Sequence, residues 1–305
     1  MNQKSIVTRF EDFINQNYLK LHKKKVIIAL STGVDSSVLL DVVEKMAIKY
    51  DFEIIICHVN HKIRQQSDIE ENYVINTYGE KHPVYIYRFN ESDKKAYNDS
   101  NFQEYARIKR LEFFSEVASK ENVKYVLLAH HLNDDIETSL FRLIRGASLN
   151  AICGIRDVQE WRNITILRPF LTTLKKDLIE YAKENDVKYY EDSSNNGDNY
   201  ERNRIRHNIV TNIFKENPSF ENNYLIFKER LKYASSLVDE KRDKYIHNHI
   251  KSEKKRLNID YNSFIKLDHI LQEEVLFEIL KKYQFSLVNI KDIIKIINIG
   301  NNGLF

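Results

Sequence analysis

Residues 26–40 have the sequence VIIALSTGVDSSVLL, in which two apolar runs flank a short polar segment. The first run predicts a buried strand, the polar segment a tight turn, and the second run the start of a helix. A turn between a strand and a helix is a common phosphate site, because the helix N-terminus presents unpaired N–H groups and the positive end of its dipole. No lysine follows the turn, so the stretch does not match a Walker A loop.

Outward from this stretch, short apolar runs alternate with longer amphipathic segments up to about residue 190. The apolar runs, too short for helices and rich in Val, Ile and Tyr, are residues 25–30, 53–59, 83–89 and 124–130. The amphipathic segments are residues 36–49, 65–78, 102–119 and 134–145. Such alternation is typical of β-α-β units, so we expect an α/β fold with a mostly parallel, Rossmann-like sheet and helices on both faces.

A different pattern begins near Pro218. Strand candidates vanish there, and segments such as YLIFKERLKYASSLVDEKRDKYI and HILQEEVLFEILKKY carry apolar residues at the spacing of helices. The stretch KENPSFENN, residues 215–223, is polar and contains the proline, as is typical of a domain boundary. We therefore expect two domains, residues 1–216 and a smaller, mainly helical domain over residues 217–305.

Composition narrows the class of protein. The chain has 305 residues, of which 42% are hydrophobic, enough to build packed cores. Its formal net charge of +3 does not by itself indicate a nucleic-acid partner, so such a surface must come from local clusters of Lys and Arg. Cys57 and Cys153 are far apart in sequence, which argues against a disulfide framework, a zinc ribbon and an iron–sulfur site. We interpret both as small buried residues.

The sequence also bears on location. The segment MNQKSIVTRFEDFINQNYL lacks the apolar core of a signal peptide, and no stretch approaches the roughly 20 apolar residues that span a membrane. We expect a cytoplasmic protein without a membrane partner. Whether it forms a homodimer is left open.

The polar turn offers ligands for a nucleotide. Its hydroxyl and N–H groups can bind phosphate oxygens, and we predict ATP contacts from Ser31, Thr32, Gly33, Val34, Asp35 and Ser36. A carboxylate repels a polyphosphate unless a cation lies between them, so Asp35 indicates a Mg²⁺ site and the loop indicates ATP with Mg²⁺. The competing interpretation is an ordinary Ser/Thr helix cap. The position after the first strand of an α/β pattern favours the nucleotide.

The segment STGVDSS, residues 31–37, resembles the S-G-G-x-D-S loop of the N-type ATP pyrophosphatases, the PP-loop superfamily. The resemblance implies cleavage of ATP to AMP and pyrophosphate, with a carbonyl oxygen activated as an adenylate. Thr32 stands where the pattern has its first glycine. A threonine there can still supply its N–H and hydroxyl if its backbone torsions permit.

Four further stretches resemble the tRNA(Ile)-lysidine synthetase family, in order and at plausible spacing. They are CHVNHKIR, FQEYARIKRLEFF, LLAHHLNDDIETSLFRLIRGAS and LRPFLTTLKKDLIEYAKENDVKYYEDSSNNGDNYERNRIRHNIV. The resemblance implies an ATP-dependent carbon–nitrogen ligase that joins free L-lysine to C2 of the wobble cytidine in the CAU anticodon of tRNA(Ile). It also implies an adenylated cytidine intermediate, release of AMP and pyrophosphate, and a product tRNA that reads AUA as isoleucine.

Asp134 and Glu137 are three residues apart in HHLNDDIETSLFRLIRG, so a helix places both carboxylates on one face. A lysine amine, with a pKa near 10.4, is almost entirely protonated at pH 7, and a carboxylate must hold and deprotonate it. Both residues match the acidic pair of the resembled family, which implies roles in catalysis and lysine binding. Asp135 stands where that family often has Gln or Asn. The competing interpretation is a solvated acidic helix start.

Two further groups are candidates for contacts with ATP. His58, Asn60 and His61 follow the second strand, where they can contact the adenine or the phosphates; we discount zinc because no third His or Cys ligand is nearby. Arg107 and Arg110 are three residues apart on an amphipathic helix and can reach a phosphate or an adenylate, although a basic helix face also explains such a pair. The resembled pattern A-R-x-x-R implies a catalytic role for Arg107.

Two basic segments are candidates for tRNA contacts. The resembled motifs D-x-S-N and R-N-x-x-R match Asp192, Ser194, Asn195, Arg202, Asn203 and Arg206. Arg202 and Arg206 can bind RNA phosphates or can knit their loop to the core. The run KSEKKR, with Lys254, Lys255 and Arg256, is the stronger electrostatic candidate, against the alternative of a solvated face. The helical domain therefore binds tRNA or supports the first domain.

Three rival functions remain to be weighed. A tRNA thiolase on the same fold would need catalytic cysteines or a Cys-x-x-Cys cluster, which the sequence lacks. A GMP or NAD synthetase would carry different motifs after the fourth strand. A catalytically dead tRNA-binding protein would have no need of Asp35, Asp134 and Glu137, and nucleotide-dependent release of pyrophosphate would distinguish it from the ligase.

Overall fold

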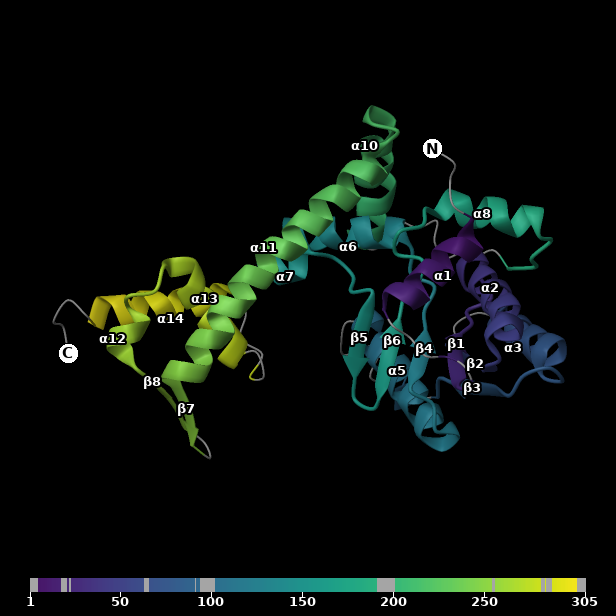
Figure 1. Ribbon diagram of the computed structural model, residues 1–305, viewed down its shortest axis with the longest axis horizontal. Coiled ribbons are helices and arrows are strands. Elements are labelled where there is room, and N and C mark those ends of the chain that lie inside the picture. Colours follow the sequence, from purple (N-terminus) through teal and green to yellow (C-terminus); the bar gives the residue numbers. More distant parts are fainter. Residues whose placement is uncertain are drawn as a thin grey trace. The chain divides into compact units, whose positions relative to one another are not determined.

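The computed structural model resolves the chain into two compact units, shown as a ribbon in Figure 1. The described residues are 5–17, 21, 23–62, 66–90, 92–93, 102–190, 201–253, 256–280, 283 and 287–300. The first unit comprises Met1–Glu137 and Ile155–Asn212, and the second comprises Thr138–Gly154 and Ile213–Phe305. The sequence predicts two continuous domains divided near residue 216, whereas the second unit also takes in Thr138–Gly154. Two hydrogen bonds tie this insertion to the second unit, one between the hydroxyls of Ser139 and Tyr224 and one from Asn150 to Asp239.

A six-stranded sheet with strand order β3-β2-β1-β4-β6-β5 forms the centre of the first unit. Its strands are β1 (Lys25–Ala29), β2 (Glu53–Asn60), β3 (Val84–Arg88), β4 (Tyr125–Leu127), β5 (Val158–Trp161) and β6 (Ile164–Leu167). All neighbours pair in parallel except β5 and β6. The four runs predicted as strands are strands, and the mostly parallel α/β fold is confirmed.

Helices cover both faces of this sheet because its strands are apolar on both sides. Val26 and Ile28 of β1 belong to one core, whereas Ile27 between them belongs to the other. The first core also contains residues of α1 (Ile6–Gln16), α2 (Val34–Tyr50), α3 (Gln66–Tyr78) and α8 (Lys175–Glu184). The second core is filled by α5 (Phe102–Glu121), which contributes Phe114 and Val117.

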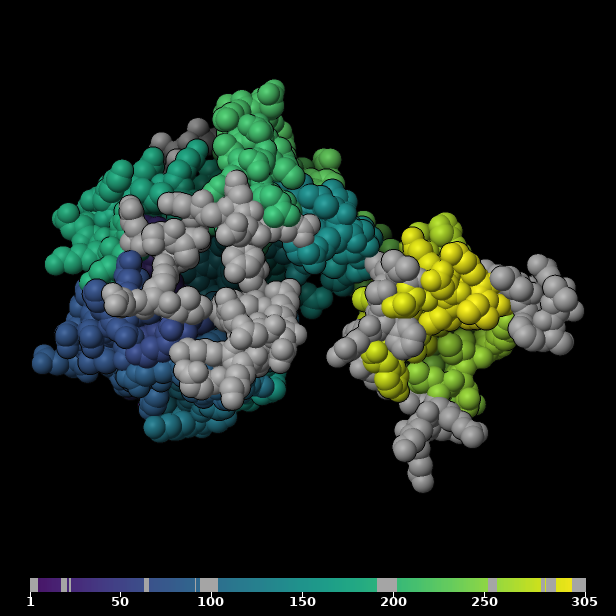
Figure 2. All heavy atoms as spheres, turned by 180° about the vertical axis from the view of Figure 1, so that it is seen from behind, coloured from purple at the N-terminus to yellow at the C-terminus, as the bar shows by residue number. Residues whose placement is uncertain are grey.

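The second unit is mainly helical, as predicted. Its helices are α7 (Leu149–Ile152), α10 (Thr211–Glu216), α11 (Phe220–His249), α12 (Tyr261–Phe264), α13 (His269–Leu280) and α14 (Leu287–Gly300), with α6 (Leu132–Ile144) shared between the units. Tyr245, Val275 and Ile290 lie in its core, and Figure 2 shows α14 in yellow at its surface. None of the described helices qualifies as a membrane span.

The prediction that strands vanish after Pro218 is wrong. β7 (Ile250–Glu253) and β8 (Arg256–Ile259) form an antiparallel hairpin in the second unit. Ile250 pairs with Ile259, and both pack against the core of this unit, while the rest of the hairpin is largely polar. The two apolar residues are too few and too far apart in sequence to produce a recognisable strand pattern.

Candidate active site

In the first unit, the point at which an open α/β sheet forms a ligand crevice lies between β1 and β4. These strands are parallel neighbours, but the sheet continues from β1 to β2 on one side and from β4 to β6 on the other. The loops that leave such a pair diverge, and open α/β sheets bind ligands at this point. Asp35 at the start of α2 and His131 before α6 meet there, with Oδ1 and Nε2 3.7 Å apart.

The loop of residues 31–37 closes on itself at the N-terminus of α2. Ser36 Oγ accepts from the N–H of Ser31 at 3.1 Å and donates to the carbonyl of Gly33 at 3.1 Å. Ser37 Oγ donates to the carbonyl of Thr32 at 3.3 Å. These bonds are the local hydroxyl contacts that a purely structural cap would also make. They fix the loop and leave the first-turn N–H groups of α2, which have no partner within a helix, to meet an anion.

Thr32 adopts the left-handed backbone conformation, with φ of 65°. This region suits glycine and is unfavourable for a β-branched residue. The residue is 1% exposed, its Oγ1 donates to the carbonyl of Ser31 at 2.6 Å, and its own carbonyl accepts from the N–H of Tyr190 at 2.9 Å. Gly33, by contrast, has φ of −69° and needs no glycine for its torsion. The structure thus places a threonine in a torsion that favours glycine, at the position where the resembled pattern has its first glycine.

Lys175 places a cation beside the loop, whose own sequence contains none. It begins α8, and its Nζ donates to both carboxylate oxygens of Asp35 at 2.7 Å. Its backbone N–H donates to Oδ1 of Asn133 at 2.9 Å, which ties the start of α8 to the start of α6. The side chain is therefore held at the carboxyl edge of the sheet, next to the N-terminus of α2.

His131 and Asp134 cap α6 reciprocally. The N–H of His131 donates to Oδ2 of Asp134 at 3.1 Å, and the N–H of Asp134 donates to Nδ1 of His131 at 3.4 Å. This is the arrangement of a capping box. Because Nδ1 accepts, the network assigns the ring proton to Nε2, the atom that faces Asp35.

Glu137 and Asp134 converge on one cation, Arg206. The guanidinium of Arg206 donates to the two oxygens of Glu137 at 2.7 and 3.0 Å and lies 3.6 Å from Asp134. Arg202 Nε is 3.6 Å from Glu137. Glu137 is 2% exposed, so its charge requires such partners. Both carboxylates thus meet at a cation of the same chain, and the predicted binding of a lysine amine by Asp134 and Glu137 stays a prediction.

The two arginines reach Glu137 from a single helical stretch. Arg202 lies in α9 (Glu201–Arg204) and Arg206 in η2 (Ile205–Val210), a π-helical turn. Such turns are rare and frequently occur at functional sites. Ile205 and Val210 anchor the turn in the core, at 3% and 5% exposed. The position of Arg206 beside the acidic pair is thus fixed by packing as well as by charge.

The environment of Asp134 keeps it ionised. Burial raises its pKa, but the adjoining His131, the hydrogen bond from the N–H of His131 and the nearby Arg202 outweigh burial and hold the pKa of Asp134 below its ordinary value. An ionised carboxylate at neutral pH can hold an ammonium group.

Two other residues predicted to contact ATP, Asn60 and His61, make contacts within the protein. The amide nitrogen of Asn60 donates to Ser67, Asp68 and Glu71 at 3.2, 2.8 and 2.8 Å, which joins β2 to α3. We therefore assign Asn60 a structural role. His61 packs edge-on against Phe89, with ring centroids 4.6 Å apart.

His58 remains a candidate. Its Nδ1 is 2.8 Å from the carbonyl of Leu30, just before the loop, and its buried Nε2 has no hydrogen-bond partner among the described residues. Burial lowers the pKa of this ring, so it is neutral. A neutral ring next to the loop can accept a hydrogen bond from a ligand.

The structure also shows the surroundings of Arg107, of Asp135 and of the two cysteines. Arg107 is exposed and lies 3.4 Å from Glu104. Asp135 is fully buried and accepts from the N–H of Ile155 at 2.6 Å, so it serves as a backbone anchor. Cys57 is buried, as expected, but Cys153 is only half-buried.

Several predicted residues lie outside the described part of the chain or have no described side chain. Asp192, Ser194, Asn195, Lys254 and Lys255 are outside it, and only the backbone of Arg256 is described.

Sequence reasoning misses Lys175, His130, His131 and Arg168 as site residues. Lys175 is followed by Lys176, and nothing in the segment LKKDL indicates which of the two lysines meets Asp35, which lies more than a hundred residues earlier. Arg168 directly follows β6, a strand that the sequence pattern does not predict. The two histidines follow β4, and their position at the carboxyl end of a strand is the sequence feature that could have indicated them as candidates.

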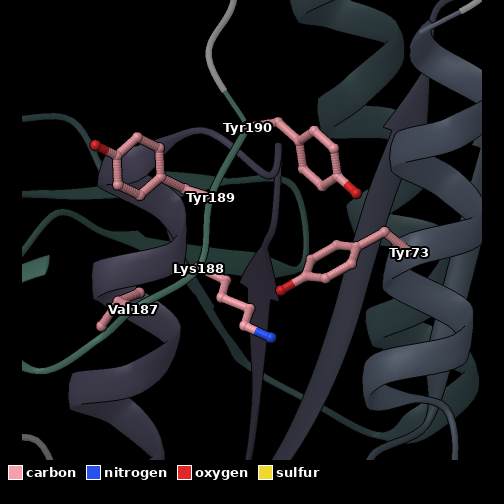
Figure 3. Close-up of a pocket in the computed structure, with 5 residues that line it drawn as sticks. All are labelled: Tyr73, Val187, Lys188, Tyr189 and Tyr190. Carbon is pink, nitrogen blue, oxygen red and sulfur yellow. The ribbon is translucent and has the colours of Figure 1, made fainter.

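A separate hollow of about 380 Å³ lies beside the loop and is lined by Tyr73, Val187, Lys188, Tyr189 and Tyr190. Figure 3 shows Tyr190 and Tyr73 turned toward one another, and their rings are 5.1 Å apart and T-shaped. None of these five described lining residues carries a carboxylate, and Asp35, Asp134 and Glu137 are not among them.

Comparison with known proteins places this arrangement in context. Residues 2–213 match the family model of the PP-loop domain. The chain is 39% identical over 211 residues to a tRNA(Ile)-lysidine synthase of Streptococcus pyogenes, covering 69% of this chain and 46% of that protein. It is 32% identical over 217 residues to the tRNA(Ile)-lysidine synthase of Enterococcus faecalis, covering 70% and 46%. The chain thus spans about half the length of the curated relatives it matches.

A solved structure supports the fold. The U34-tRNA thiolase NcsA from Methanococcus maripaludis, solved with its [4Fe-4S] cluster, superposes with a TM-score of 0.61 at 16% identity. The match covers 74% of this chain and 77% of that one. At this identity the likeness concerns the fold alone.

Proposed function

The chain belongs to the PP-loop domain family, and from this premise we propose that it is a tRNA(Ile)-lysidine synthase, a tRNA-modifying ligase that consumes ATP. It joins the ε-amine of free L-lysine to C2 of the wobble cytidine in the CAU anticodon and releases AMP and pyrophosphate. One observation carries the proposal. Asp134 and Glu137 converge on a single cation, one contact away from Asp35 through His131.

The loop and Asp35 suit ATP with Mg²⁺. The N-terminus of α2 offers N–H groups to the phosphates, and Mg²⁺ is commonly held by one or two carboxylates together with substrate phosphates. Among the described residues no three His, Cys, Asp or Glu side chains form a self-contained metal site, so Asp35 would share the ion with ATP. When bound, Mg²⁺ supplies charge neutralisation at the phosphates.

In the first step the cytosine carbonyl oxygen attacks the α-phosphorus of ATP, an O–P bond forms, and the bond to pyrophosphate breaks. Negative charge on the phosphate oxygens is stabilised by the N–H groups of the loop. Lys175 Nζ, now on Asp35, is close enough to the loop to turn to a phosphate oxygen. It thereby replaces the lysine that a Walker A loop carries within its own motif.

In the second step the lysine amine attacks C2 of the adenylated cytidine, and the bond to AMP breaks. Asp134 and Glu137 hold the ammonium group, and one of them accepts the proton that the amine loses. In the ligand-free chain Arg206 occupies these carboxylates, so the ammonium group shares or displaces its bonds. The amine thus enters a site already shaped for a cation.

Recognition of the tRNA is assigned to basic segments. We keep residues 1–216 as the catalytic part and residues 217–305 as a part that binds the tRNA or supports the catalytic part. Lys254, Lys255 and Arg256 are the proposed phosphate contacts. Arg202 and Arg206, proposed from sequence as RNA contacts, are engaged by Glu137, which favours a role at the acidic pair.

The test is incubation of the purified protein with ATP, Mg²⁺, labelled lysine and total tRNA, followed by nucleoside analysis. We expect label in a modified cytidine and one pyrophosphate released per lysine incorporated. The same assay with Asp35→Asn is the matched control, because it removes the metal-binding charge without changing side-chain size. Pyrophosphate release without label in any nucleoside would reject lysine as the substrate.

A further inference from the structure

A cluster of basic side chains near the acidic pair has no role in the mechanism so far. Arg110 comes from α5, Arg168 directly follows β6, and His130 follows β4. The charge interactions of His130 include Arg110, Arg168 and Asp134, so the three basic residues lie near one another and near the acidic pair. Each has a buried side-chain nitrogen without a hydrogen-bond partner among the described residues: Nε of both arginines and Nδ1 of the histidine.

Arg168 is a buried cation held only by neutral groups. It is 5% exposed, and its two terminal nitrogens donate to the carbonyl of Arg156 at 2.8 Å and to the amide oxygen of Gln159 at 3.0 Å. No ion pair of this guanidinium with a described carboxylate is found. Burial lowers the pKa of Arg168 to about 10, and Arg107 and Arg110 add to this effect.

Arg110 is a second such cation. It is half-buried, and its guanidinium makes no hydrogen bond or ion pair with any described residue. Burial and the neighbouring Arg107 lower its pKa. Two desolvated guanidinium groups that repel one another cost free energy unless an anion joins them. Two such guanidinium groups can bind an anion. A carboxylate suits arginine, because the planar guanidinium donates two parallel hydrogen bonds to its oxygens.

His130 links this cluster to the acidic pair. Its ring interacts electrostatically with Asp134 and also with Arg168 and Arg110, so all three lie within charge range of one imidazole. Burial lowers the pKa of His130 to about 3, so the ring is neutral and adds no cation. A ligand in this region therefore meets carboxylates at Asp134 and Glu137 and guanidinium groups at Arg110 and Arg168.

We propose that Arg110 and Arg168 bind the α-carboxylate of the amino-acid substrate, while Asp134 and Glu137 bind its ε-amine. This rests on the proposed function. A phosphate group is less suited to the position, because the phosphates of ATP are assigned to the loop, Asp35 and Lys175. The arrangement makes the two arginines specificity determinants that select a free amino acid over an amine lacking the carboxylate.

The experiment compares L-lysine with cadaverine, which has the same chain and amine but no carboxylate. Arg110→Met, Arg168→Met and the conservative Arg168→Lys are assayed beside Arg204→Met, an exposed arginine that serves as control. Pyrophosphate release with tRNA and ATP in the absence of lysine is measured separately from incorporation. Arg110→Met is the primary variant, because it breaks no described hydrogen bond and is expected to fold.

We expect the wild-type protein to prefer lysine over cadaverine in kcat/KM by at least about 10²-fold, the scale of two charge-assisted bonds. In Arg110→Met this preference falls by about 10-fold or more through a higher KM for lysine, while pyrophosphate release is unchanged. Arg168→Lys restores part of what Arg168→Met loses. Arg204→Met behaves like wild type.

Two results would overturn the inference. If Arg110→Met lowers pyrophosphate release in the absence of lysine, the cluster binds a phosphate of ATP or of the tRNA instead. If it changes neither reaction, the cluster is not a ligand site. Failure of the proposed function is distinguishable, because then the wild-type protein itself would incorporate no lysine.

Discussion

Lys175 Nζ lies 2.7 Å from both carboxylate oxygens of Asp35, so one ammonium group neutralises the residue assigned to Mg²⁺. The pair joins the starts of α8 and α2 at the carboxyl edge of the sheet. Metal binding at Asp35 must compete with this ion pair. In the proposed mechanism, Mg²⁺ at Asp35 would release this ammonium group to bind a phosphate oxygen of ATP.

We expect Lys175→Met to raise the KM for ATP in pyrophosphate release by about 10-fold or more, since a hydrogen bond to a charged group contributes about 1.5–3 kcal/mol. Lys176→Met, at the adjacent exposed position, is the control and should leave the KM unchanged. Initial rates at varied ATP and fixed free Mg²⁺ give the measurement. An unaltered KM in Lys175→Met would restrict Lys175 to neutralising Asp35.

Asp134→Asn separates the two chemical steps. The amide keeps an oxygen for the N–H of His131 but loses the charge that holds the amine, so lysine incorporation should fall by about 10²-fold while pyrophosphate release changes little. Asp135→Asn is a closely matched control, because the carboxylate of Asp135 accepts from the N–H of Ile155 and an amide oxygen can accept the same bond. Parallel loss of both activities in Asp134→Asn would place Asp134 at the ATP site.

Because Thr32 has a left-handed backbone conformation, we expect glycine to be more stable than alanine at this position. Thr32→Gly should be more stable than Thr32→Ala by about 1 kcal/mol, because both lose the side chain but only alanine keeps the unfavourable torsion. At Gly33, where φ is −69° and an added Cβ would meet Ser31 Oγ at 3.8 Å, alanine should instead be tolerated. Urea unfolding of the three variants gives the free energies. Equal stability of the two Thr32 variants would contradict the strain.

His130 makes stability depend on pH. Its pKa is about 3 in the folded chain against 6.5 for an ordinary histidine, so the unfolded chain takes up the proton first. The stabilisation is complete above pH 6.5 and is lost as the pH falls from 6.5 towards 3. Between pH 7 and pH 5 we expect the wild-type free energy of unfolding to fall by about 1–2 kcal/mol more than that of His130→Asn.

His247→Asn serves as the control for this measurement, because it removes an imidazole that is exposed rather than buried. Its pH dependence should match that of the wild type. If His130→Asn matched the wild type as well, the ring of His130 would not be desolvated in solution.

Replacing Lys254, Lys255 and Arg256 with Ala should weaken tRNA binding and reduce the slope of log affinity against log salt by about 2–3, while ATP binding stays the same. Lys120→Ala with Lys124→Ala removes cations before β4, at the opposite edge of the sheet from the candidate site, and is the control. Filter binding at several salt concentrations measures the slope. An unaltered slope in the triple variant would move the RNA surface elsewhere.

The part of the fold that sequence predicts is the part with strong periodicity. The four apolar runs became β1 to β4, and in β1 the alternation of Val26, Ile27 and Ile28 between two cores shows burial on both faces. The hairpins β5–β6 and β7–β8 are not predicted, because their four-residue strands follow one another without an intervening helix and so lie outside the alternation of apolar runs and amphipathic segments.

The candidate site divides in the same way. The sequence identifies Asp35, Asp134 and Glu137 as candidates, because the other residues of each motif are close neighbours in sequence. Lys175 and Arg206 cannot, because they meet those carboxylates only through tertiary structure. Asn60 shows the reverse case, in which a position after a strand suggests a ligand contact but the amide joins β2 to α3.

The internal cations also determine how the site responds to its ligands. Asp35 and Glu137 already carry partners, Lys175 and Arg206, so each incoming cation replaces an existing ion pair rather than adding a charge to a bare carboxylate. Binding is therefore an ion exchange, and affinity is the difference between two similar pairings. A ligand that offers only one positive charge gains little from such an exchange. Under the proposed function, lysine and ATP with Mg²⁺ each bring charges of both signs, so each also offers an anion to the Lys175 or Arg206 that it displaces.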